Sequence, residues 1–168
     1  GNNDYAVYLK KAPLVGNIAV SYLSASIFLF GGALAGVGGA LMALPVAGIT
    51  FLAMIARELL KDAEDVDGDR AGGAVTVPML IGIRRTAILA LGLLAVAVAI
   101  SLLPVGRGWG LPYLGAIGMM DGILLVAAGR VVRCRTPECI RTSGATAMLK
   151  FGMFGALTVF VVSAILAA

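Results

Sequence analysis

Five stretches of about twenty apolar residues, each almost free of charge, divide this 168-residue sequence. They cover residues 14–36, 39–60, 86–105, 111–129 and 148–168. About twenty apolar residues in a helix span the hydrocarbon core of a bilayer. Only 13% of the residues are charged, against about 25% in soluble domains, so a soluble fold would lack polar surface. The sequence therefore predicts an all-α fold: a polytopic transmembrane helix bundle, with residues 1–168 forming a single membrane domain.

The positive charges support this count of spans. With five spans, the amino terminus and the loops after the second and fourth spans share one side, and twelve of the thirteen Lys and Arg residues fall there: Lys10, Lys11, Arg57, Lys61, Arg70, Arg84, Arg85, Arg130, Arg133, Arg135, Arg141 and Lys150. The other side has Arg107 alone. Basic residues concentrate on the cytoplasmic side of membrane proteins. We therefore expect an integral multi-pass protein of the cell membrane with its acidic loop in the cytoplasm. The lipid bilayer is its surrounding partner, and no nucleic-acid partner is expected.

The acidic stretch "RELLKDAEDVDGDRAGG", residues 57–73, directly follows the second apolar span. Five of the nine acidic residues of the chain lie between positions 62 and 69. If the helix continues at 100° per residue, one group of acids falls within about 60° on one face: Glu58, Asp62, Asp65 and Asp69. Glu64 and Asp67 point nearly the opposite way, and Gly68 is a candidate end of the helix.

The convergent acids predict a cation site at the membrane boundary. Carboxylates on one face repel one another unless a cation lies between them, and their hard oxygen atoms suit Mg²⁺. Lys61, Arg57 and Arg70 flank the acids and could contact phosphate oxygens. Metal-binding carboxylates beside phosphate-binding cations indicate a diphosphate site. The competing interpretation is a solvated acidic loop that caps a helix without chemistry.

Two segments resemble a known family. "KDAEDVDGDRAGGAVTVPMLIGIRR", residues 61–85, resembles the second aspartate-rich motif of UbiA-type membrane prenyltransferases, K-D-x-x-D-x-x-G-D followed by T-x-P. "YLKKAPLVGN", residues 8–17, resembles the basic segment and P-L-x-G-N of the same family, two spans upstream. The resemblance is closest to the archaeal branch that joins geranylgeranyl diphosphate to a glycerol-phosphate lipid. It covers roughly residues 5–85 specifically and the remainder by hydropathy.

The resemblance implies a Mg²⁺-dependent enzyme that transfers a prenyl group from a prenyl diphosphate to a lipid or aromatic acceptor. It assigns Asp62, Asp65 and Asp69 as catalytic residues that bind Mg²⁺ and diphosphate. Lys61 would pair with phosphate oxygens, with Arg57 and Arg70 as further diphosphate ligands. The upstream segment adds Lys10 to the diphosphate site and Asn17 to the lining of the same cavity.

One feature of the family is missing from the sequence. Family members have about nine spans and a first aspartate motif of the type N-D-x-x-D, whereas five spans are found here and no such motif. We therefore expect this chain to be the carboxy-terminal portion of a longer protein, with half of the metal site elsewhere. Such a portion alone should not catalyse the reaction.

Asp121 lies in the middle of the fourth span, in "GMMDGILL". A carboxyl group at this depth is costly and is a candidate functional residue. It could line the substrate cavity, or it could pack against a hydroxyl such as those of Ser21, Ser24 or Ser26.

A non-enzymatic alternative is a membrane transporter or scaffold whose acidic loop binds cations. A transporter should carry ionisable residues along a path through several spans, and Asp121 is the one clear example, which favours the enzyme.

Histidine is absent, which removes the usual general base and zinc ligand. Cys134 and Cys139 have neither CxxC nor four-ligand zinc spacing, so we expect two free thiols.

Overall fold

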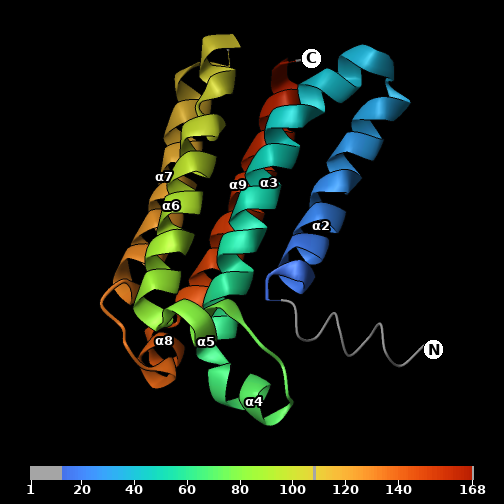
Figure 1. Ribbon diagram of the computed structural model, residues 1–168. Helices are drawn as coiled ribbons and strands as arrows, with labels where there is room; N and C mark the ends of the chain where they lie inside the picture. Colours follow the sequence, from blue (N-terminus) through green and yellow to red (C-terminus); the bar gives the residue numbers. More distant parts are fainter. Residues whose placement is uncertain (1–12, 108, 168) are drawn as a thin grey trace, which may run out of the picture.

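Five long helices form a bundle in this computed structural model, which describes residues 13–107 and 109–167. They are α2 (Val15–Leu34), α3 (Gly36–Glu64), α6 (Ile83–Ser101), α7 (Gly110–Val131) and α9 (Ala145–Ala167). The helices run alternately in opposite directions along one axis (Figure 1). All five are long and apolar enough to cross a membrane. The predicted all-α bundle with five spans is therefore confirmed, and α3 runs further into the acidic stretch than the predicted 39–60.

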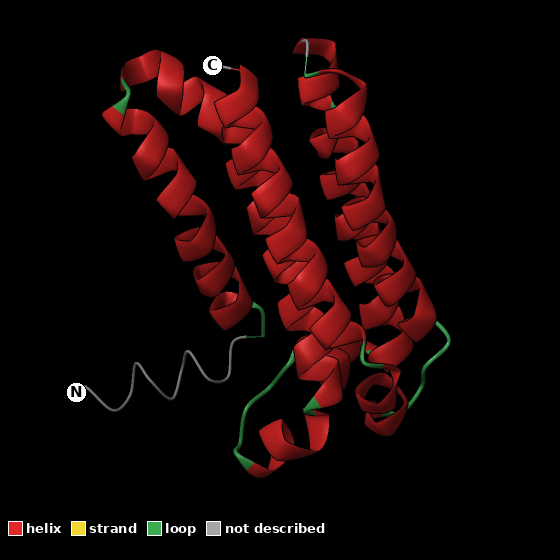
Figure 2. Ribbon diagram, turned by 180° about the vertical axis from the view of Figure 1, so that it is seen from behind, coloured by secondary structure: helices red, strands yellow, loops and turns green. Residues whose placement is uncertain are grey.

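Three short α-helices gather at one end of the bundle, as Figures 1 and 2 show. They are α4 (Val66–Ala71), α5 (Val77–Ile81) and α8 (Pro137–Ser143), and a 3₁₀ turn at Leu103–Arg107 lies near the other end. Proline in the first turn starts both α5 and α8, where its missing N–H costs nothing. The loops after the second and fourth spans thus share one end, as the distribution of basic residues predicts.

Close backbone contact joins α2 to α3. A single residue, Ala35, separates the two helices. A Cβ atom added to Gly32 would lie 2.6 Å from the carbonyl oxygen of Gly39, so neither position has room for a side chain. Small residues allow such close packing of helices in lipid. Pro45 interrupts the hydrogen bonding of α3, and the first turns of that helix lie at an angle to the remainder in Figure 1.

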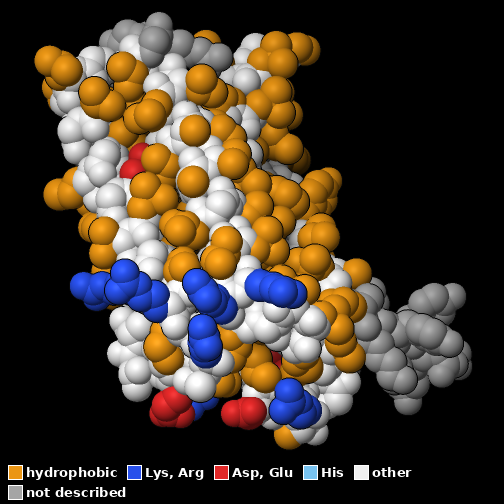
Figure 3. Space-filling model, turned by 60° about the vertical axis from the view of Figure 1, so that its left-hand side comes forward, with side chains coloured by type: hydrophobic (Ala, Val, Ile, Leu, Met, Phe, Trp, Pro, Cys, Tyr) orange, Lys and Arg blue, Asp and Glu red, His pale blue; other side chains and the backbone are white. Residues whose placement is uncertain are grey.

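The larger of two hydrophobic clusters in the bundle lies toward the end that carries the short helices. Leu59 and Leu60 of α3 are fully buried, as are Leu94 of α6, Ile140 of α8 and Leu149 of α9. In contrast, large apolar side chains cover the outside of the long helices. Figure 3 shows this apolar surface, with a row of Lys and Arg side chains beneath it and acidic side chains lower still. This layering matches the hydrocarbon core and the charged boundary of a bilayer.

The structure corrects the expectation for the two cysteines. Cys134 and Cys139 form a disulfide, with their Cα atoms 5.5 Å apart. Cys134 is buried in the loop before α8. The side chain of Thr136 caps α8 by accepting the backbone N–H of Cys139 at 3.4 Å. This first turn of α8 brings Cys139 back over Cys134, a proximity that the C-x4-C spacing does not reveal.

Candidate active site

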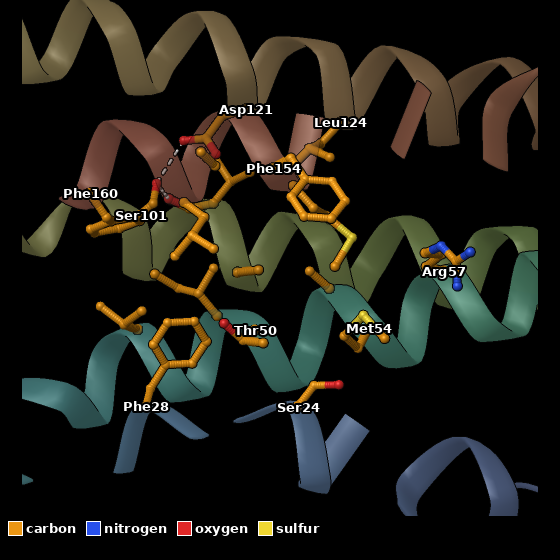
Figure 4. A pocket seen from close by; sticks show the side chains of 18 of the residues that line it. Ser24, Phe28, Thr50, Met54, Arg57, Ser101, Asp121, Leu124, Phe154 and Phe160 are labelled. Carbon is orange, nitrogen blue, oxygen red and sulfur yellow. Dashed lines mark hydrogen bonds between the residues drawn. The ribbon is translucent and has the colours of Figure 1, made fainter. Parts of the chain in front are cut away.

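A cavity of about 520 Å³ lies between the long helices, and each of the five contributes to its wall. Figure 4 shows it from close by. Apolar side chains dominate the lining, among them Phe28, Met54, Leu124, Phe154 and Phe160. Cavities of this size hold small molecules and keep water from most of their surface. The cavity is therefore suited to an apolar ligand, or to the apolar part of a larger one.

Two cations mark one end of the cavity. Arg57 of α3 and Lys150 of α9 both line it, and in Figure 4 Arg57 lies at the opposite end from Asp121 and Phe160. The guanidinium of Arg57 is half-buried and pairs with the carboxylate of Glu58. Asp62 follows five residues later in the same helix, about 7.5 Å further along its axis. The charged end of the cavity thus leads directly to the acidic stretch.

Asp62 of that stretch is anchored to a neighbouring helix. The side-chain amide of Asn17, on α2, donates a hydrogen bond of 2.8 Å to Oδ2 of Asp62. Asp62 is half-buried, and Glu58 and Asp69 lie near enough for their charges to repel its carboxylate. Asn17 itself is not among the residues that line the cavity. Its contact instead ties α2 to the start of the acidic stretch.

The chain changes direction at Asp65. That residue ends α3 with φ −104° and ψ 12°, and α4 begins at the next residue and contains both Gly68 and Asp69. Asp65 is exposed, whereas Asp69 is half-buried. Within residues 13–107 and 109–167 no group of three or more His, Cys, Asp or Glu side chains is placed to hold a metal. The single helix that was predicted to carry all the acids is therefore interrupted at Asp65. Asp62 and Asp69 are half-buried against the bundle, whereas Asp65 is not.

The predicted diphosphate ligands lie around this turn. Lys61 Nζ is 4.0 Å from Asp65 Oδ2, and both side chains are about half exposed. Arg70 lies exposed in α4, while Arg57 reaches the cavity. Lys10 falls outside the described residues.

Glu64, assigned to the opposite face, has a structural contact. Its Oε2 accepts a hydrogen bond of 2.9 Å from Thr146 of α9, and its backbone carbonyl accepts one of 3.1 Å from Arg141 of α8. Asp67 is exposed. Glu64 therefore connects α3 to the last two helices.

Asp121 is buried in the cavity wall. Ser101 Oγ, on α6, lies 2.6 Å from Oδ2 of Asp121, and the hydroxyl of Tyr113 donates to the carbonyl oxygen of Ser101 at 2.5 Å. The hydroxyl partner of Asp121 is thus Ser101 of α6, and not Ser21, Ser24 or Ser26 of α2. The fourth span packs against α6 and α9, and the hydroxyls of Ser24 and Ser26 donate to backbone carbonyls within α2.

Sequence reasoning missed Lys150 as a site residue, although the sequence carried a signal. A lysine interrupts the apolar run at the start of the last span, and charged residues at such depth usually face the bundle interior or a polar boundary. Only the packing of α9 against α7 and α3 places it at the same cavity as Arg57.

Comparisons with known proteins agree with this architecture. The sequence profile of the UbiA prenyltransferase family matches residues 5–157. The chain therefore belongs to the UbiA prenyltransferase family, and it is a multi-pass membrane protein.

Among its relatives are two archaeal proteins named digeranylgeranylglyceryl phosphate synthase. The protein from Methanoculleus marisnigri is 56% identical over 162 residues, covering 96% of this chain and 58% of the relative. The one from Methanoregula boonei is 53% identical over 161 residues, covering 96% and 57%. A solved structure, described as giving insights into the biosynthesis of digeranylgeranylglyceryl phosphate synthase in membranes, superimposes with a TM-score of 0.83 at 30% identity and covers 94% of this chain and 55% of that one. The chain thus spans less than three fifths of the length of these relatives.

Proposed function

We propose that this chain is part of an intramembrane prenyltransferase that moves a prenyl group from a prenyl diphosphate to a lipid-phosphate acceptor. The observation that carries the proposal is an apolar cavity with Arg57 and Lys150 at one end, next to the acidic stretch of a UbiA-family chain. The names of the relatives favour geranylgeranyl diphosphate as the donor and a glycerol-phosphate lipid as the acceptor. The family resemblance also allows an aromatic compound as the acceptor in place of the lipid.

The apolar cavity and the nearby cations bind different parts of the prenyl diphosphate. The apolar wall takes the prenyl chain and keeps water from the carbon at which the bond to diphosphate breaks. Arg57, Lys61 and Lys150 offer positive charge to the diphosphate oxygens at the polar end. Charge placed where a leaving group becomes more negative lowers the barrier to its departure. The acceptor oxygen then forms the new bond to the same carbon and loses its proton.

The acidic stretch is suited to Mg²⁺. The ion binds through one or two carboxylates and completes its coordination with phosphate oxygens and water. Asp62 and Asp69, with Asp65 beside them, supply such carboxylates, and the hydrogen bond from Asn17 fixes one oxygen of Asp62. When bound, Mg²⁺ supplies the positive charge that stabilises the departing diphosphate.

We propose that the end of the bundle that carries the acidic stretch faces the cytoplasm.

Replacing Asp62 tests the proposal in the full-length protein. We expect Asp62→Asn to lower prenyl transfer from labelled geranylgeranyl diphosphate by about 100-fold or more, because one charged ligand at the reacting diphosphate is lost. Asp67→Asn is the matched control, since it removes the same charge from an exposed position of the same segment and should change the rate by less than about twofold. Product formation is measured with and without Mg²⁺.

Two outcomes would contradict the proposal that the full-length protein is a prenyltransferase. One is a rate of diphosphate release that is indifferent to both Mg²⁺ and Asp62→Asn. The other is transport of a cation without any prenyl product, which would favour the transporter.

A further inference from the structure

A second, open cavity of about 310 Å³ lies outside the candidate active site. It is formed where α5 meets α6 and where the chain leaves α7, and its lining consists of Ile81, Gly82, Ile83, Arg84, Arg85 and Arg135. None of these residues lines the larger cavity. Figure 3 shows Lys and Arg side chains in a row below the apolar surface on this side of the molecule.

The backbone brings the three arginines together from distant parts of the sequence. Gly82 has φ 84° and ψ 155°, a conformation that glycine adopts without strain, and it joins α5 directly to α6. Arg84 and Arg85 therefore lie in the first turn of α6. Arg135 lies between the buried, disulfide-bonded Cys134 and the cap of α8, so its backbone is held on both sides.

These arginines have no carboxylate partner in the part of the chain that the structure describes. The ion pairs found there join Arg57 to Glu58, Lys61 to Asp65 and Arg141 to Glu138. Arg130 and Arg133 add two further exposed guanidiniums near the end of α7. Like charges that converge without counter-charge repel one another, so an anion in the cavity would stabilise the arrangement.

We propose that Arg84, Arg85 and Arg135 form a binding site for a phosphate group, separate from the prenyl-transfer site. Guanidinium groups bind phosphate oxygens with pairs of parallel hydrogen bonds. The site lies where α6 begins and just beyond the end of α7, which is the level of lipid headgroups, and basic pockets at this level bind anionic lipids. Ile81 and Ile83 in its wall suit the apolar part of a lipid next to its headgroup. The phosphate is carried by an anionic lipid or is free in solution.

Binding to purified full-length protein in a neutral detergent tests the site. Dioctanoylphosphatidylglycerol and inorganic phosphate are titrated separately at low salt, and the apparent Kd is measured for each. We expect the triple variant Arg84→Gln, Arg85→Gln, Arg135→Gln to bind the lipid at least about tenfold more weakly, because it loses several charge-assisted hydrogen bonds. The matched control is Arg130→Gln with Arg133→Gln, which removes nearby charge outside the cavity and should change Kd by less than about twofold.

The two ligands distinguish the sources of the phosphate. Tight binding of the lipid alone supports a headgroup site, whereas equal binding of inorganic phosphate with the same loss in the triple variant supports a site for free phosphate. Arg135→Gln alone serves if the triple variant fails to fold, because Arg135 is exposed; we expect it to weaken binding about threefold. The proposal is overturned if neither ligand binds the unmodified protein, or if the pocket variants and the control variant weaken binding equally.

Discussion

At the scale of single residues, Asn17 links the acidic stretch to another helix. Its amide holds Oδ2 of Asp62 at 2.8 Å. Residues that orient a metal ligand commonly change metal affinity or activity 10- to 100-fold when they are replaced. We therefore expect Asn17→Ala in the full-length protein to raise the Mg²⁺ concentration needed for half-maximal prenyl transfer by about 10-fold or more.

The control for this prediction is Ser26→Ala in the same helix. The hydroxyl of Ser26 donates to the carbonyl oxygen of Leu23 within α2, so its loss leaves the acidic stretch untouched. If Asn17→Ala and Ser26→Ala require the same Mg²⁺ concentration as the unmodified protein, Asn17 does not position a metal ligand.

The pair of Ser101 and Asp121 is a second residue-scale case, because both groups are buried and their oxygens are 2.6 Å apart. A double-mutant cycle with Ser101→Ala and Asp121→Asn measures their interaction. We expect a coupling free energy of about 0.6–2 kcal/mol in thermal or denaturant unfolding in detergent, the range of hydrogen bonds between membrane helices. Effects that simply add would mean that the two side chains do not stabilise each other.

At the scale of elements, the contact of α2 with α3 depends on two glycines. A Cβ atom added to Gly39 would overlap the backbone carbonyl oxygen of Gly32, and a backbone atom cannot rotate away to relieve the contact. We expect Gly39→Ala to force the two helices apart and to lower the melting temperature of the full-length protein in detergent.

Gly38→Ala provides the matched control at the neighbouring position. A Cβ atom there meets nothing within 4 Å, and alanine favours helix over glycine by about 1 kcal/mol. The melting temperature of Gly38→Ala should therefore stay the same or rise. Equal destabilisation by both substitutions would show that the close contact with Gly32 is not the reason for glycine at position 39.

At the scale of the whole molecule, the three short α-helices and most of the described Lys and Arg residues lie at one end of the bundle (Figures 1 and 3). The positive-inside rule predicts that this end faces the cytoplasm. Single cysteines at Asp67 and Arg133, introduced after both native cysteines are replaced by serine, should react with a membrane-impermeant maleimide in inside-out vesicles only. A cysteine at Leu111, near the other end, should react in right-side-out vesicles only.

Labelling of all three positions from one face would contradict the five-span arrangement. Labelling with the opposite sidedness would leave the arrangement intact and reverse its orientation. The two results separate the architecture of the bundle from its placement in the membrane.

Much of the architecture could be predicted because it depends on local properties of the sequence. The length and apolarity of each segment determine whether it can cross a bilayer, and the five predicted spans correspond to α2, α3, α6, α7 and α9. The family resemblance likewise rested on motifs contiguous in sequence, and the family profile extends it over residues 5–157.

The site was less predictable where it depends on helix packing. Helical phasing placed Asp62, Asp65 and Asp69 on one face, but the chain turns at Asp65 and leaves that side chain exposed. Lys150 lines the same cavity as Arg57 only because α9 packs beside α3 and α7. Asp121 found its partner on α6, a neighbour that no spacing in the sequence identifies.

The sequence by itself determined that this chain has five segments long and apolar enough to cross a membrane, where its charges gather and to which family it belongs. Hydrophobic length and charge distribution act on each segment separately, so they can be read without knowledge of its neighbours. Only the tertiary structure decided which side chains share the apolar cavity, that Asn17 holds Asp62, and that Arg84, Arg85 and Arg135 meet. Helices in lipid pack through the detailed shapes of their surfaces, and those contacts join residues that are far apart in the chain.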